Sequence, residues 1–158
     1  MTYDKKIIAG IFVLFILLLF MGGDDGSELS PDIDIDEWDP VADGTASEYR
    51  AQSMKIYETL AFSGFEKSSV KVTDDYVLIA YEQPPVRSQV DSLLSWFYMM
   101  GTAVEIAPHA ERIVIQMYSD DEPLYQVEAY TTDVQSLLNY EIDMDEFRSK
   151  VVVKSIVA

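Results

Sequence analysis

Four aspartates in one short stretch have the spacing of a calcium-binding loop. Asp32, Asp34, Asp36 and Asp43 occupy positions 1, 3, 5 and 12 of such a loop, where alternate oxygens converge on one hard cation. Position 6, which requires a glycine for the sharp turn, is Glu37. The four aspartates are therefore candidate metal ligands, while a solvated acidic tether is the favoured interpretation of this stretch.

Few other groups are suited to acid–base chemistry. His109 is the only histidine of the sequence, and it can act as a general base, but no nucleophile motif accompanies it. Two carboxylate pairs, Asp74 with Asp75 and Asp120 with Asp121, fall in expected turns, where aspartate caps the local backbone. The sequence also lacks a glycine-rich phosphate loop and a histidine pair for metal binding. We therefore predict a non-enzymatic protein without a cofactor, and keep a membrane-tethered hydrolase as the third hypothesis.

A run of large apolar side chains is the main candidate for partner binding. Trp96, Tyr98 and Met99 belong to the segment Ser-Trp-Phe-Tyr-Met-Met, which surrounds its helix with apolar groups on every side. One sheet cannot cover all of these groups, so either neighbouring helices hide the outer ones or they form an exposed contact stripe. Trp38, which lies among the acidic residues, is a further partner-binding candidate, with packing onto its own domain as the alternative.

Local signals place the first helix of the folded part at residues 46–63. Thr45 and Glu48 have the spacing of a capping box, in which each side chain satisfies a free amide of the first turn. Gly64 follows as a C-terminal cap, with Phe65 placed to contact the helix.

The rest of the chain predicts two hairpins and three further helices. Alternating apolar residues indicate one hairpin with its turn near Asp74 and another with its turn at 119–123, and a long helix lies between them. Thr132 and Asp143 mark two short helices before a final β-branched strand. The order αββαββααβ predicts an α+β domain, with an antiparallel sheet of four or five strands and the helices on one face. The expected long helix, hairpin and last strand cover residues 87–105, 111–130 and 151–158.

Composition excludes several classes of function. The chain has 158 residues and no cysteine, so disulfides and thiolate chemistry are absent. Its formal net charge of −17 would repel nucleic acid phosphates and anionic lipid headgroups, so nucleic acid is not expected as a partner. An acidic surface that serves only solubility is an equally simple explanation of the charge.

An uncharged apolar run near the N-terminus predicts a single membrane-spanning helix. It is preceded by Lys5 and Lys6 and followed by acidic residues, so the N-terminus is expected inside and the domain outside. A cleaved secretory signal is the alternative, although no small-residue cleavage pattern follows the run. The expected parts are a cytoplasmic N-terminus at 1–6, a signal-anchor helix at 7–23, an acidic linker at 24–44 and an extracytoplasmic α+β domain at 45–158.

The anchor, the tether and the apolar run together favour a membrane-anchored binding or assembly module. Its partner would be another protein or a second copy of the chain. The alternative is a sensor domain that binds a small ligand or a cation in a pocket between the sheet and the helices.

The predicted topology is testable with one substitution. Gly26→Cys introduces the only cysteine of the chain just beyond the anchor. We expect this cysteine to react with a membrane-impermeant maleimide in intact cells, because the residues after the helix face outward. Labelling that requires permeabilised cells would contradict this orientation.

Overall fold

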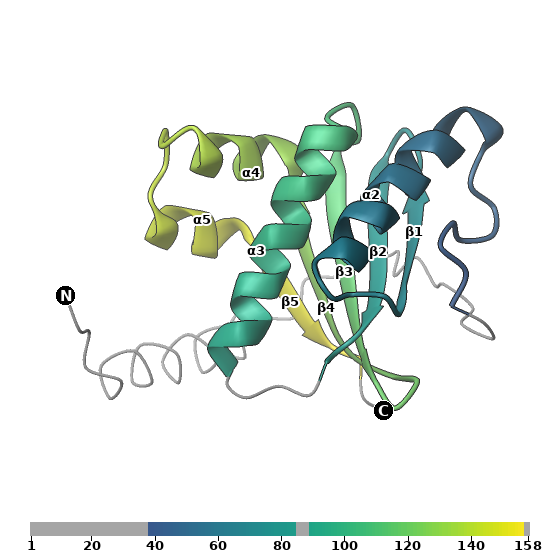
Figure 1. Cartoon of the computed structure of the whole chain (residues 1–158). Coiled ribbons are helices and arrows are strands. Elements are labelled where there is room, and N and C mark those ends of the chain that lie inside the picture. Colours follow the sequence, from purple (N-terminus) through teal and green to yellow (C-terminus); the bar gives the residue numbers. More distant parts are fainter. Residues whose placement is uncertain (1–37, 85–88, 157–158) are drawn as a thin grey trace.

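The folded part is a five-stranded sheet with helices packed on one face (Figure 1). The computed structural model describes residues 38–84 and 89–156. The observed order confirms the predicted α+β class and the sequence of elements αββαββααβ, with one short 3-10 turn, η1, added at the start. The elements are η1 (Ser47–Tyr49), α2 (Arg50–Phe62), β1 (Ser68–Val72), β2 (Tyr76–Glu82), α3 (Gln89–Ile106), β3 (Arg112–Ser119), β4 (Glu122–Tyr130), α4 (Thr131–Leu138), α5 (Met144–Lys150) and β5 (Val152–Ser155).

The sheet is mixed, so the prediction of an antiparallel sheet was wrong at one pair. The strands lie in the order β1-β2-β3-β4-β5, and both predicted hairpins are antiparallel, as is the β4–β5 pair. However, β2 and β3 run parallel, with Ile79 opposite Ile115. The reason is α3, whose 18 residues rise about 27 Å and return the chain to the end of the sheet where β2 begins.

The predicted N-terminal cap of the first helix was wrong, and its predicted C-terminal cap is confirmed. The hydroxyl of Thr45 donates to the carbonyl of Ala42 at 2.7 Å, and α2 begins only at Arg50, so the predicted capping box at Thr45 was wrong. The C-terminal cap is confirmed, because Gly64 has a φ of 98° and the amide of Phe65 donates to the carbonyl of Leu60 at 3.0 Å.

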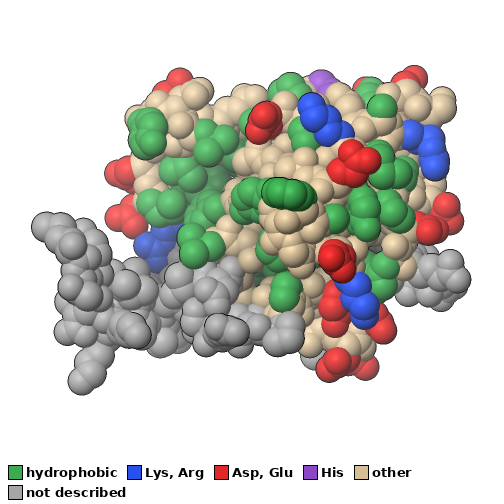
Figure 2. Space-filling view, in the orientation of Figure 1, with side chains coloured by type: hydrophobic (Ala, Val, Ile, Leu, Met, Phe, Trp, Pro, Cys, Tyr) green, Lys and Arg blue, Asp and Glu red, His purple; other side chains and the backbone are tan. Residues whose placement is uncertain are grey.

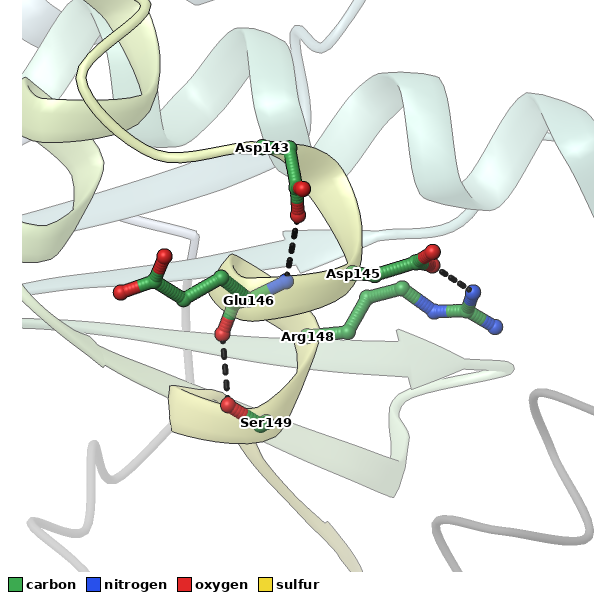
Figure 3. Close-up of polar contacts among 5 residues, drawn as sticks. All are labelled: Asp143, Asp145, Glu146, Arg148 and Ser149. Carbon is green, nitrogen blue, oxygen red and sulfur yellow. Dashed lines mark hydrogen bonds and ion pairs between the residues drawn. The ribbon is translucent and has the colours of Figure 1, made fainter.

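The predicted cap of α5 is confirmed. The side chain of Asp143 accepts a hydrogen bond from the amide of Glu146 at 2.8 Å (Figure 3). Along the same helix, Arg148 pairs with Asp145 at 2.9 Å and the hydroxyl of Ser149 donates to the carbonyl of Glu146 at 2.6 Å. These local bonds stabilise a helix of only seven residues, which is too short to be stable by itself.

The predicted cap of α4 was wrong by two residues, because the N-cap is Tyr130. The helix begins at Thr131, so Thr132 lies inside it. Thr131 is buried, and its hydroxyl donates to the carbonyl of Ala110 at 2.6 Å. The start of α4 is therefore attached to the loop before β3 by a tertiary hydrogen bond.

The core lies between the helices and one face of the sheet. Alternate residues of each strand point toward α2, α3, α4 and α5, as the period of a strand requires. We call the opposite surface of the sheet the second face. It carries the residues between those of the core, and it includes Leu78, Ala80, Val114, Gln116 and Gln126. The core face is built around Ile56, Leu60, Val70, Ile79, Tyr81, Met99, Ala103, Ile113, Ile115, Val127, Val134 and Phe147.

Residues 38–44, predicted as the end of the linker, are joined to the sheet. The carbonyl of Pro40 accepts from the amide of Val70 at 3.1 Å, and the amide of Ala42 donates to the carbonyl of Val70 at 2.9 Å. The folded domain thus includes the chain from Trp38 onward. The predicted anchor at 7–23 lies outside the described residues, and within them no helix is long and apolar enough to cross a bilayer.

Two glycines should respond in opposite directions to replacement by alanine. Gly64→Ala should lower the free energy of unfolding by about 1 kcal/mol, because its φ of 98° is disfavoured for a residue with a Cβ atom. Gly101→Ala should raise it by about 0.5–1 kcal/mol, because Gly101 lies inside α3 and a Cβ atom there meets open space. Urea denaturation of both variants tests this pair, and changes of the same sign would contradict it.

Candidate functional site

An apolar hollow between α3, α5 and the strands β4 and β5 is the best candidate for a functional site. Its cavity volume is about 20 Å³. Figure 2 shows apolar side chains gathered on this side of the molecule, over α3, α4 and α5. Of the nine residues that line the hollow, all but one are apolar: Leu93, Trp96, Phe97, Met100, Val127, Phe147, Arg148, Val151 and Val153.

A hydrogen bond to the core fixes the orientation of Trp96 in this hollow. Its indole nitrogen donates to the hydroxyl of Tyr81 at 2.9 Å, and this hydroxyl donates in turn to the side-chain oxygen of Gln83 at 2.9 Å. Burial raises the pKa of Tyr81 well above its ordinary value, so the phenol stays protonated and keeps this role. The ring of Trp96 is therefore a rigid wall rather than an adaptable one.

The opposite wall comes from the short helix α5. The ring of Phe147 is buried and lies 5.9 Å from the ring of Phe97, measured between centroids. Full burial of a phenylalanine stabilises the fold by about 1.5–3 kcal/mol, so Phe147 attaches α5 to α3. The single charged lining residue, Arg148, is paired with Asp145. The hollow thus suits an apolar group, and its lining offers no side chain for acid–base catalysis.

The predicted partner-binding residues do not form one stripe. Trp96 lines the hollow, whereas Met99 is 0% exposed and lies in the core, so it is not available for a partner. Tyr98 is 40% exposed, and its hydroxyl shares a hydrogen bond of 2.6 Å with the hydroxyl of Ser63 at the end of α2. Helix α3 therefore presents its apolar residues in three directions, toward the core, the hollow and α2.

Trp38 packs onto its own domain. Its ring meets that of Tyr118 edge to face at a centroid distance of 5.5 Å, and its indole nitrogen donates to Asp121 at 3.0 Å. Trp38 therefore packs against its own domain, which was the alternative to partner binding for this residue.

The four aspartates of the calcium-like spacing are not brought together by described structure. Asp43 is exposed in the loop before η1, while Asp32, Asp34 and Asp36 lie outside the described residues. Within residues 38–84 and 89–156, no group of three potential ligands has an arrangement that could hold a metal ion.

His109 is part of a small exposed cluster with Tyr49 and Asp74. The rings of His109 and Tyr49 stack at 5.0 Å, and the phenol of Tyr49 donates to the carboxylate of Asp74. This hydrogen bond is the main reason that the pKa of Tyr49 is raised to about 12, and burial and nearby negative charges add to it. A raised pKa disfavours the phenolate, so Tyr49 is unsuited to act as a base near neutral pH.

The other carboxylate pair has a structural role. Asp120 and Asp121 form the two-residue turn between β3 and β4, with φ values of 52° and 61°. The amides of both residues point to the carboxylate of Glu82, and the hydrogen bond from Asp120 is 2.6 Å long. Aspartate tolerates this left-handed conformation better than most residues, which explains the pair.

The sequence alone did not single out Leu93, Phe147, Val151 or Val153 as site residues. They belong to a long helix, a short capped helix and a β-branched final segment, and the sequence pattern of each is that of ordinary core. The single local signal was the number of apolar groups on α3, which exceeded what one sheet can cover.

Comparisons with known proteins give no significant match among family models, curated proteins or solved structures. Function must therefore be argued from the site.

The cluster around Tyr49 yields a pH prediction. Asp74→Asn should shift the pKa of Tyr49 from about 12 toward the ordinary value of about 10, because the carboxylate that accepts the phenol hydrogen bond is lost. Because the pKa of Tyr49 is higher in the folded state, its neutral phenol stabilises the fold. This contribution to the free energy of unfolding is fully present below about pH 10 and is lost as the pH rises through about 12. NMR titration of the tyrosine rings measures the shift, with His109→Ala as a control. An unchanged midpoint in Asp74→Asn would contradict the assignment.

Proposed function

We propose that this chain is a non-enzymatic, membrane-anchored binding or assembly module that holds an apolar segment of a partner protein in the hollow between α3 and α5. The observation that carries this proposal is the composition of the hollow, in which eight of nine lining side chains are apolar. The apolar run at 7–23 supplies the anchor, with the domain on the outer side of the membrane.

Exposed apolar side chains around the hollow support a macromolecular partner. Leu94 on α3 and Met144 on α5 are each more than one-third exposed, on two helices that contribute to the hollow. Such side chains extend the apolar area beyond what a small molecule would cover, and they are typical of the centre of a protein interface.

The charge of the chain indicates the kind of segment that fits. Asp143, Asp145 and Glu146 are exposed on or beside α5, next to the hollow, in a chain whose net charge is −17. A partner segment with an apolar centre and basic flanks would complement both features. Its large apolar side chains would contact the walls formed by Trp96 and Phe147.

A sensor that binds a small apolar ligand in the same hollow is the second candidate. A cavity volume of about 20 Å³ holds roughly one water-sized group, so such a ligand would place only one small apolar group in the hollow. The two candidates differ in what occupies the hollow, so one experiment separates them.

Site-specific photo-crosslinking tests the occupant. A photoreactive residue at Leu93, in the full chain in its native membrane, should form an adduct with a discrete protein, because Leu93 lines the hollow. The matched control is the same probe at Phe62, which is 94% exposed on α2 and lies outside the hollow. The adduct from Leu93 should disappear in a Val151→Glu background, since a carboxylate would then face the apolar segment.

The outcomes distinguish the candidates. Circular dichroism of Val151→Glu verifies that this variant is folded. If Leu93 and Phe62 give the same adducts, the hollow is not the binding site and the proposal fails. If Leu93 gives no protein adduct and native mass spectrometry of the purified chain shows a bound small molecule, the sensor replaces the assembly module.

A further inference from the structure

Tyr140, in the connection between α4 and α5, has a backbone conformation that is rare for a large side chain. Its φ is 59°, in the left-handed region that glycine favours. Within the described residues, the other non-glycine residues with a positive φ are Asp120 and Asp121, and aspartate tolerates this conformation better than tyrosine. Tyr140 is therefore held in its conformation at a cost to the stability of the fold.

The end of α4 imposes this conformation on Tyr140. The amide of Tyr140 donates to the carbonyl of Leu137 at 3.1 Å, and the amide of Glu141 donates to the carbonyl of Ser136 at 2.9 Å. Two bonds of this kind end a helix through one left-handed residue, which is most often glycine and is here Tyr140. Ile142, two residues later, packs against the core. The connection between the helices is therefore a fixed part of the fold.

The side chain of Tyr140 does not stabilise the fold by packing. It is 95% exposed, so it buries almost no apolar area. Leu138 and Met144, on either side of it, are 52% and 45% exposed. We call residues 138–146 the α4–α5 corner, and Figure 1 shows this connection at the outer edge of the molecule. Three large exposed side chains so close in the chain are typical of a contact surface.

The charge of the α4–α5 corner is only negative. Residues 138–146 contain no lysine or arginine, and their carboxylates are those of Glu141, Asp143, Asp145 and Glu146. All four of these residues are exposed. The next basic residues, Arg148 and Lys150, are each paired with a carboxylate. The corner would therefore repel anionic lipid and a second copy of this chain, whose net charge is −17, and a basic protein segment would complement it.

We propose that the α4–α5 corner binds an arginine-bearing segment of a partner protein, with a guanidinium group stacked on the exposed ring of Tyr140. Arginine suits this surface because its planar guanidinium can stack on an aromatic ring and pair with a carboxylate at the same time. Glu141 is exposed next to Tyr140 and forms no ion pair with any other described residue, so it supplies that carboxylate. The alkyl stem of the arginine contacts Leu138 and Met144. This surface is separate from the hollow and extends the contacts of the proposed module.

Binding of a basic peptide to the full chain tests the α4–α5 corner. The probe is a fluorescent peptide of alternating arginine and alanine, and its anisotropy is measured with the full chain in a nonionic detergent. Tyr140→Gly should raise the Kd of this peptide about three- to fivefold, because one exposed cation–π contact is lost. The matched control is Phe62→Ala, which removes an aromatic ring that is 94% exposed on α2 and should leave the Kd unchanged.

A second pair of variants separates local from general attraction. Glu141→Lys should raise the Kd of the peptide by more than Tyr140→Gly does, because a like charge then faces the guanidinium. Glu58→Lys changes the net charge equally at an exposed position of α2 and should have less than half of that effect. Equal effects of the two lysine variants would show that the peptide is attracted by net charge alone, and would overturn the proposal.

A stability measurement distinguishes a contact role of Tyr140 from a structural one. Tyr140→Gly should raise the urea midpoint of unfolding, because glycine adopts a φ of 59° without the cost of a Cβ atom. A lower midpoint would show that the side chain serves the fold, and the proposal would fail. Val151→Glu, in the lining of the hollow, should not weaken binding of the peptide. If it does, the peptide occupies the hollow and the corner is not its site, so this proposal and the proposed function fail separately.

Discussion

The parallel pairing of β2 with β3 is the constraint on which the other elements depend. Parallel strands need a connection that returns the chain over the sheet, and α3 is that connection. Both strands are buried along almost their whole length, on both faces. The four described helices all pack on one face of the sheet.

Helix α3 is both a core element and one wall of the hollow. Met99 and Ala103 fill the space above the sheet, while Trp96 and Phe97 face the hollow toward α5. The hydrogen bond from Trp96 to Tyr81 joins the two regions, because Tyr81 is a core residue of β2. The geometry of the hollow is thus coupled to the packing of the central strands, and an occupant would meet a largely preformed surface.

Signals that act within a few residues predicted the local structure well. Gly64 ends α2 and Asp143 caps α5, because both depend on a conformation or hydrogen bond within one helical turn. Thr45 failed as a cap because the helical residues begin only at Ser47, with Ala46 as the N-cap, and its hydroxyl instead donates to the carbonyl of Ala42. The near-continuous apolar run of β2, with Leu78 and Ala80 between the core residues, was the available sign of a strand buried on both faces.

The sequence by itself determined the order of helices and strands, the positions of both hairpins and the α+β class, because periodicity and turn chemistry are local properties. It also identified α3 as a helix with more apolar surface than one sheet covers. Only the tertiary structure decided which side of α3 faces the hollow, that Met99 belongs to the core, and that Phe147 and Val153 complete the site. These residues come from elements far apart in the chain, and their meeting depends on the parallel pair and on the packing of α5, which no local pattern encodes.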